Sequence, residues 1–181
     1  MCALEVAPAI GTADGRGRLI LRRPVKADAT AIAELANDIG VAGMIARMPH
    51  PYGLADAEAF LARCEALDPR TDAVFAIEHR QFGVIGMLGF RQHQPRRPEL
   101  GYWLGRPFWG RGYATEAATA ALDWARRDWG KAVVWAGHFA DNRASAQVLV
   151  KAGFLYTGDV ELQDCLARGE KVPSRKMVWL A

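Results

Sequence analysis

The sequence has few cysteines and no long apolar run, and each absence excludes a class of protein. Cys2, Cys64 and Cys165 are odd in number and far apart. They therefore provide neither a disulfide framework nor the ligand spacing of a zinc site. We expect no bound metal and a reducing, cytoplasmic location. No stretch of about 18 apolar residues occurs, so we expect no membrane-spanning segment.

The sequence also lacks a concentration of charge of one sign. It has 23 Lys and Arg residues against 20 Asp and Glu residues, for a net charge of +3. The paired arginines at 22–23, 96–97 and 126–127 are dispersed, whereas a nucleic-acid-binding domain has a continuous basic stripe. We expect no nucleic-acid partner. The small positive excess suits an anionic small ligand.

The hydrophobic pattern predicts one α/β (α+β) domain over residues 18–181, after a flexible, Gly- and Ala-rich leader over residues 1–17 that lacks the features of a signal peptide. Strands are expected at 18–25, 73–78, 82–90, 99–105, 132–136, 154–160 and 174–180. Helices are expected after Asp28, from Asp56, over 115–129 and after Asp141 or Asn142. This order predicts a mixed, mostly antiparallel sheet of about six to seven strands flanked by about four helices.

A glycine-rich segment at 109–114 ("WGRGYA") lies between a strand and a helix. A Walker loop needs a lysine that this segment lacks, and a Rossmann fingerprint needs a third glycine where Thr115 stands. Gly110 and Gly112 leave the first N–H groups of the helix open to a phosphate, and Arg111 adds a positive charge. The alternative is a glycine turn with no ligand.

The wider context of that segment resembles a known family. The stretches "ELGYWLGRPFWGRGYATEA" (99–117) and "NRASAQVLVKAGF" (142–154) are similar to the GNAT superfamily of acyl-CoA N-acyltransferases, in detail to its RimJ/RimL-like ribosomal-protein acetyltransferases. The resemblance covers about residues 18–180 and implies the GNAT fold. It implies acetyl transfer from acetyl-CoA to a primary amine, with a protein N-terminal α-amino group as one candidate acceptor. A small amine such as a polyamine, aminoglycoside or amino acid is an alternative, as is a non-catalytic CoA-binding module.

The resemblance also assigns the residues that hold acetyl-CoA. Main-chain N–H groups of the glycine-rich segment would bind the pyrophosphate, and pantetheine would enter a gap between two splayed strands. An asparagine before the next helix would bond the pantetheine arm, although a helix cap alone explains that residue. The assigned residues are Trp103, Leu104, Trp109, Gly110, Arg111, Gly112, Tyr113, Ala114 and Asn142.

Acyl transfer to an amine needs a base, and two carboxylates are candidates. The resemblance places a glutamate on the strand that leads to the CoA loop, which is Glu99 here, and this residue commonly acts through water. The other candidate is Asp164, which we expect in the connection between the last two strands. A surface position is the alternative for Glu99. Either carboxylate would have to be partly desolvated, since an ordinary carboxylate is a weak base.

The leaving thiolate also needs stabilisation. Many members of the superfamily use a tyrosine that corresponds to position 149, where this sequence has leucine. Ser145, which the RimL-like branch places near the sulfur, is therefore our candidate, with Tyr113 and Tyr156 as substitutes. The acceptor pocket is expected from the segments 37–56, 91–98 and 161–173, with His50 and Tyr52 as candidates for its lining. The exposed-looking end at 177–180 ("MVWL") suggests a homodimer.

Overall fold

Eight strands form one sheet in the computed structural model, which describes residues 10–11, 17–94 and 97–181. The strands are β1 (Ile10–Gly11), β2 (Leu19–Arg22), β3 (Ala73–His79), β4 (Gly83–Gln94), β5 (Arg97–Leu104), β6 (Val133–Phe139), β7 (Leu155–Cys165) and β8 (Glu170–Leu180). Their order is β1-β2-β3-β4-β5-β6-β8-β7, and every pair is antiparallel except β5 with β6. The mixed, mostly antiparallel sheet is confirmed, with one more strand than the sequence predicted.

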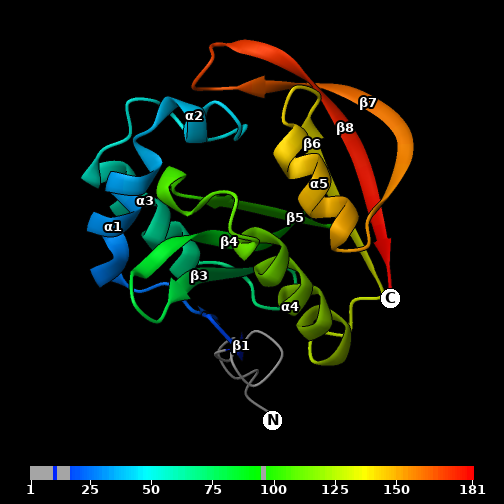
Figure 1. Ribbon diagram of the computed structural model, residues 1–181, viewed down its shortest axis with the longest axis horizontal. Helices are drawn as coiled ribbons and strands as arrows, with labels where there is room; N and C mark the ends of the chain where they lie inside the picture. The colour runs from blue at the N-terminus through cyan, green and yellow to red at the C-terminus, as the bar shows by residue number, and fades with distance from the viewer. Residues whose placement is uncertain (1–9, 12–16, 95–96) are drawn as a thin grey trace.

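Helices cover both faces of this sheet (Figure 1). They are α1 (Ala29–Ala36), α2 (Ile39–Ala42), α3 (Leu54–Glu65), α4 (Tyr113–Arg127) and α5 (Arg143–Lys151), with short 3-10 turns η1 (Lys26–Asp28) and η2 (Arg106–Phe108). The first three helices lie on one face, and α4 and α5 lie on the other. Among the described residues, no helix is both long and apolar enough to cross a membrane.

Successive side chains of β3 point to opposite faces of the sheet, and each face packs against its own hydrophobic core. Phe75 and Ile77 are fully buried against the α4 side, whereas Ala76 between them is buried against α1 and α3. Each large apolar side chain that is buried in this way stabilises the fold by about 1.5–3 kcal/mol. The predicted helical face of Ala29, Ile32, Ala33 and Ala36 is also buried, so the apolar stripe of α1 is confirmed.

The additional strand comes from the predicted leader. Ile10 pairs with Leu21, and Gly11 pairs with Ile20, which gives β2 an antiparallel neighbour. The other residues of the leader up to residue 16 lie outside the described residues.

Two segments that we expected to be loops continue strands instead. Residues 91–94 and 97–98 extend the β4–β5 ladder, and β7 and β8 pair until Cys165 meets Glu170. Most β7 side chains are exposed, so the segment lacks the alternation that identifies a half-buried strand. The expected loop over 161–173 is thus only the turn at 166–169, where Gly169 has φ +66°.

The C-terminal segment is less exposed than its composition suggested. Met177 is fully buried, and Val178 and Trp179 are partly buried because β8 lies between β6 and β7. Of the apolar side chains at 177–180 that suggested a homodimer, only that of Leu180 is largely exposed, at 61%. The homodimer stays a prediction.

A buried ion pair ties the start of α1 to the sheet. Asp28 precedes this helix as predicted, but its carboxylate does not cap it. Instead it accepts hydrogen bonds from both terminal nitrogens of Arg22, at 2.9 and 2.8 Å, and from the Val25 N–H at 2.8 Å. Burial opposes the charge of Asp28, but the Arg22 and Val25 hydrogen bonds outweigh it and hold the pKa below its ordinary value.

We expect Asp28→Asn to lower the free energy of unfolding by about 1–3 kcal/mol near pH 7, because it removes a charged acceptor of buried hydrogen bonds. The pKa of Asp28 is lower in the folded state, so its stabilisation is present above the unfolded pKa and is lost as pH falls through the folded value. Urea unfolding at about pH 7 and about pH 3 should show the difference from wild type shrinking in acid.

The control is Asp123→Asn, whose surface pairs with Arg126 and Arg127 span 3.7 and 4.0 Å. It should cost less than about 0.5 kcal/mol, and equal costs for the two variants would contradict the argument.

Candidate active site

β5 and β6 separate at the centre of the sheet. They pair at only two positions, Glu99 with Trp135 and Leu100 with Ala136. Beyond these positions, no strand among the described residues pairs with the edge of residues 101–104 that faces β6. Unpaired main-chain groups in a sheet interior need partners. This confirms the expected splay and provides a gap in which an extended ligand can bond to main chain.

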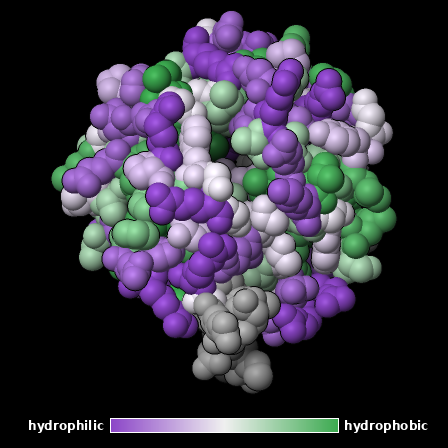
Figure 2. Space-filling model, in the orientation of Figure 1, coloured by the Kyte–Doolittle hydropathy of each residue, from purple (hydrophilic) through white to green (hydrophobic). Residues whose placement is uncertain are grey.

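A cavity of about 1290 Å³ runs from this gap to both helical sides of the sheet. Typical small-molecule sites occupy about 300–1,000 Å³, so this cavity has room for two substrates. Charged and polar side chains predominate on the face shown in Figure 2, around a small hollow. The cavity is bordered by the loop before α4, the start of α5, the segment around α2, and α3.

The loop before α4 exposes a run of main-chain N–H groups. Trp109 N–H bonds the Arg106 carbonyl at 3.2 Å, and the next bonded N–H is that of Glu116, to the Gly112 carbonyl at 3.0 Å. Between them, the N–H groups of residues 110–115 make no hydrogen bond within the described part of the chain. Such a helix N-terminus attracts anions.

Glycine is required in this loop by its backbone. Gly110 has φ +73° and Gly112 has φ +79°, a left-handed conformation that costs other residues about 1–2 kcal/mol. No neighbouring atom lies closer than 3.9 Å to a Cβ built at either position, so the conformation, and not crowding, demands glycine. The side chain of the intervening Arg111 is exposed, and it does not border the cavity.

Three polar contacts hold the loop in place. The Trp109 Nε1–H donates to the Leu104 carbonyl at 2.7 Å, which folds the indole back on the end of β5. Arg106 forms a two-pronged ion pair with Asp38, the N-cap of α2, at 2.7 and 2.9 Å. Hydrogen bonds from Arg106 lower the pKa of Asp38 to about 2. The Arg18 guanidinium donates to the Arg111 carbonyl at 3.3 Å.

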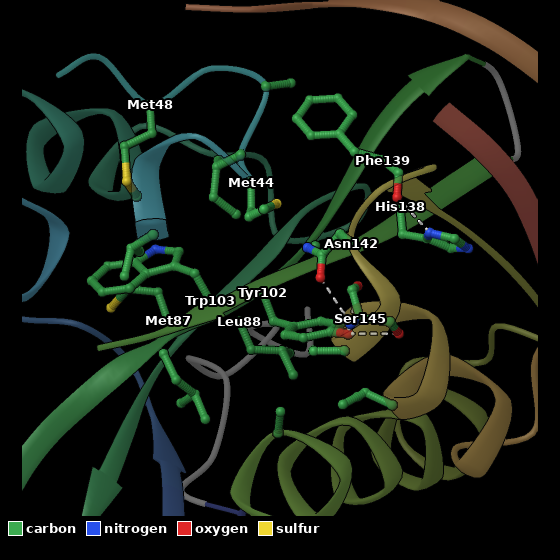
Figure 3. Close-up of a pocket in the computed structure, with 18 of the residues that line it drawn as sticks. Met44, Met48, Met87, Leu88, Tyr102, Trp103, His138, Phe139, Asn142 and Ser145 are labelled. Carbon is green, nitrogen blue, oxygen red and sulfur yellow. Dashed lines mark hydrogen bonds between the residues drawn. The ribbon is translucent and has the colours of Figure 1, made fainter. Parts of the chain in front are cut away.

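A pair of hydroxyl groups lies where β5 approaches α5 (Figure 3). The Tyr102 hydroxyl is 2.9 Å from Ser145 Oγ and 3.3 Å from the Ser145 carbonyl. The Ser145 N–H donates to Asn142 Oδ1 at 3.0 Å, which confirms the predicted cap. Asn142 Nδ2 makes no hydrogen bond with a described residue. Burial raises the pKa of Tyr102 to about 12, so its hydroxyl stays protonated at physiological pH.

Sequence reasoning missed Tyr102, although a signal was present. Alternate residues of a strand share a face, so Tyr102 lies on the same face as Leu100 and Leu104. Both leucines belong to the core against α4. A tyrosine between them therefore projects toward the helix that carries Ser145.

The two tyrosines that we considered instead have other partners. Tyr113 is buried beside the cavity, and its hydroxyl is 3.2 Å from Nε2 of His79. Tyr156 does not border the cavity, and its hydroxyl is 3.0 Å from Nε2 of His138. Ser145 and Tyr102 are therefore the hydroxyl groups best placed in the gap.

The two candidate carboxylates are placed very differently. Glu99 borders the cavity with its side chain 33% exposed, and Oε1 is 4.0 Å from Nζ of Lys176. The expectation that Asp164 lies in the connection between the last strands is wrong, since it is inside β7 opposite Lys171. Gln163 borders the cavity, and Asp164 is exposed because adjacent residues of a strand face opposite ways.

The part of the cavity beside α1 and α2 is mostly apolar. Met44, Met48, Met87 and Trp103 gather there in Figure 3, apart from the hydroxyl pair. The predicted contribution of segment 37–56 is thus confirmed for the cavity lining. Met87 of β4 was missed, because alternation identifies it as a sheet residue without showing which layer covers it.

Helix α3 adds a wall that, apart from Asp56, lies outside the segments expected to form the acceptor pocket. The residues that line it are Asp56, Ala59, Phe60 and Arg63. Their spacing of i, i+3, i+4 and i+7 puts them on one side of a helix. Tyr52 also lines the cavity as we expected, whereas His50 is exposed outside it.

A splayed sheet that leads to an uncapped helix N-terminus defines a class of acyl-CoA-dependent transferases. Residues 18–155 match the family model described as an acetyltransferase (GNAT) domain, and the chain belongs to this family. It is therefore an acetyl-CoA-dependent acyltransferase with the GNAT fold.

Known members of this family differ in what they acetylate. The chain is 30% identical over 154 residues to the uncharacterized N-acetyltransferase YoaA of Bacillus subtilis, covering 78% of this chain and 81% of that protein. A RimL alpha-N-protein acetyltransferase solved with coenzyme A is 19% identical, with a TM-score of 0.80 over 96% of this chain and 98% of that one. A Vibrio cholerae spermidine N-acetyltransferase solved with CoA and spermine is also 19% identical, with a TM-score of 0.76 over 90% and 95%. At this identity the solved structures support the fold, and not an acceptor.

Gly112→Val should weaken CoA binding by more than about tenfold, because a β-branched residue is strained at φ +79° and would move the open N–H groups. Isothermal titration with CoA measures the effect. The matched control is Gly169→Val, at φ +66° in the β7–β8 turn outside the cavity. It imposes similar strain and should leave CoA affinity unchanged. Wild-type affinity in Gly112→Val would remove the loop from the CoA site.

Proposed function

We propose that this protein acetylates a primary amine in the manner of the RimJ/RimL-like branch, with a protein N-terminal α-amino group as the first candidate acceptor. The observation that carries the proposal is the β5–β6 gap, which has open N–H groups of residues 110–115 at its mouth and Glu99 at its closed end. An α-amino group has a pKa near 8, so its neutral form costs under about 1 kcal/mol at neutral pH, against about 4 kcal/mol for lysine.

In this proposal acetyl-CoA occupies the mouth and the gap. The N–H groups of the loop bind the pyrophosphate, and the pantetheine bonds the free edge of β5 at Trp103 and Leu104. Asn142 serves twice, since its Oδ1 caps α5 while its Nδ2 is left for the pantetheine. The proposed contacts are Trp103, Leu104, Trp109, Gly110, Arg111, Gly112, Tyr113, Ala114 and Asn142. Of these, Arg111 contributes through its main chain and its charge.

The chemistry follows from the two sides of the gap. Glu99 takes a proton from the acceptor ammonium, directly or through water, and the amine nitrogen attacks the thioester carbonyl. The new C–N bond forms, the C–S bond breaks, and the thiolate is left near Ser145. The Ser145 hydroxyl hydrogen-bonds to the sulfur while its oxygen accepts from Tyr102, 2.9 Å away. The nitrogen loses a second proton as the amide forms, and the thiolate takes up this proton to leave as the CoA thiol, while Glu99 releases the first proton to solvent.

Glu99→Gln keeps the size and hydrogen-bonding capacity of this residue but removes its basicity. We expect turnover to fall about 100-fold while the KM for acetyl-CoA is unchanged. Asp164→Asn is the control, because Asp164 is exposed outside the cavity, and it should keep wild-type turnover. Thiol release in the presence of an amine measures both. Normal turnover in Glu99→Gln would show that the amine arrives deprotonated and that positioning dominates.

Ser145→Ala should lower turnover about 10- to 100-fold, because the variant loses the hydroxyl that hydrogen-bonds the leaving thiolate. Tyr102→Phe should act in the same direction and by less, because Tyr102 works through Ser145. In the double variant the effects should be less than additive. Tyr156→Phe is the control, because Tyr156 does not border the cavity and its hydroxyl bonds His138, and turnover should not change. Additive losses, or none, would argue against the hydroxyl pair.

A further inference from the structure

A hydroxyl without a hydrogen-bond partner lies on the α1–α3 side of the cavity, which we assign to the acceptor and call the acceptor region. Tyr52 is only 7% exposed, and its main-chain N–H is fixed by Asn37 Oδ1 at 3.0 Å. Its hydroxyl makes no hydrogen bond with the described residues. Among the described residues, Trp124 Nε1 is the one side-chain polar atom that is both fully buried and without a hydrogen-bond partner. The Tyr52 hydroxyl is therefore not fully buried. Tyr52 is one of the residues that line the cavity.

This hydroxyl is a permanent donor. Burial, with the nearby Asp56 carboxylate, raises the pKa of Tyr52 to about 12, so the phenol stays neutral at physiological pH. A neutral phenol that is held rigidly in a cavity suits a ligand group that accepts hydrogen bonds.

A free cation lies on the same wall. Arg63 lines the cavity from α3, and its guanidinium makes no hydrogen bond or ion pair with the described residues. Arg91, which also lines the cavity, pairs with Asp72 at 2.9 Å. Asp56 and Arg47 line the cavity without an ion pair among the described residues, and Asp56 Oδ2 accepts the Gly53 N–H at 2.8 Å. Two unpaired arginines against one carboxylate leave a positive excess, which suits an anion.

Apolar side chains line the same cavity as Tyr52, Arg63 and the proposed base. Met48, Met87, Trp103 and Phe60 line the cavity, and Glu99 borders it on β5. Thioether and aromatic groups favour an apolar body of adaptable shape. A second ammonium on the acceptor would lie near Arg63, so a polyamine fits this lining poorly.

We propose, on the basis of the proposed function, that the acceptor carries its amine and a carboxylate on opposite sides of an apolar group. Arg63 and Tyr52 bind the carboxylate, and the methionines and Trp103 contact the apolar group. A short amino carboxylate has this chemistry, and so does a protein N-terminus with an apolar first residue followed by an acidic one.

The experiment compares acceptors that differ only in charge. The probes are the dipeptide Met-Leu with a free C-terminal carboxylate, its C-terminal amide, the amide of Met-Glu, and spermidine. We expect kcat/KM for Met-Leu to exceed that of its amide at least tenfold, with spermidine poorest. Activity with Met-Glu amide comparable to Met-Leu would assign the carboxylate to a side chain, as in a protein N-terminus, and a low value would assign it to a small amino carboxylate.

Variants link that preference to the two residues. Arg63→Gln and Tyr52→Phe should each raise the KM for Met-Leu about tenfold or more, with the KM for acetyl-CoA and the rate with the amide unchanged. Arg126→Gln is the matched control, since Arg126 lies outside the cavity and pairs with Asp123 at 3.7 Å. A preference for the amide or spermidine, or a preference that survives in Arg63→Gln, overturns this inference and leaves acetyl transfer intact. If no amine is acetylated although acetyl-CoA binds, the proposed function fails and the inference fails with it.

Discussion

The site depends on where two parallel strands stop pairing. β5 and β6 share two paired positions and then diverge, so main-chain groups in the middle of the sheet are left for a ligand. A sheet can tolerate this only where the strands are held from outside. β4 holds β5 along its whole length, and β8 holds β6 from Val133 to Phe139. The long antiparallel ladders on either side thus maintain the gap, and the helices above and below line it.

Most of the fold could be predicted because its helices bury one apolar face each and its central strands are apolar segments buried on both faces. The apolar stripe of α1 and the continuous apolar segment of β3 predicted both elements. The prediction failed where burial does not impose a pattern. β7 is exposed along most of its length, and β1 has only two residues, so neither carries a periodic signal.

The candidate site was predictable where glycine or a helix cap dictates backbone geometry. Gly110, Gly112 and Asn142 have the conformations or bonds that the sequence indicated. The Tyr102–Ser145 contact and the wall of α3 were not predicted, because they depend on which helix packs over which strand. Asp164 was misplaced for a related reason, since a shift of one position along a strand exchanges the two faces.

The ion pair between Arg106 and Asp38 joins two regions that the proposed function assigns to different substrates. Arg106 belongs to the turn that leads into the open N–H groups, and Asp38 caps α2, beside the methionines of the acceptor region. In that assignment, the ion pair connects the site that binds acetyl-CoA to the site that binds the acceptor. If acetyl-CoA tightens acceptor binding through this pair, the acceptor must tighten acetyl-CoA binding by the same factor. The pair is partly exposed, so added salt screens it, and cooperativity between the substrates would decline as ionic strength rises.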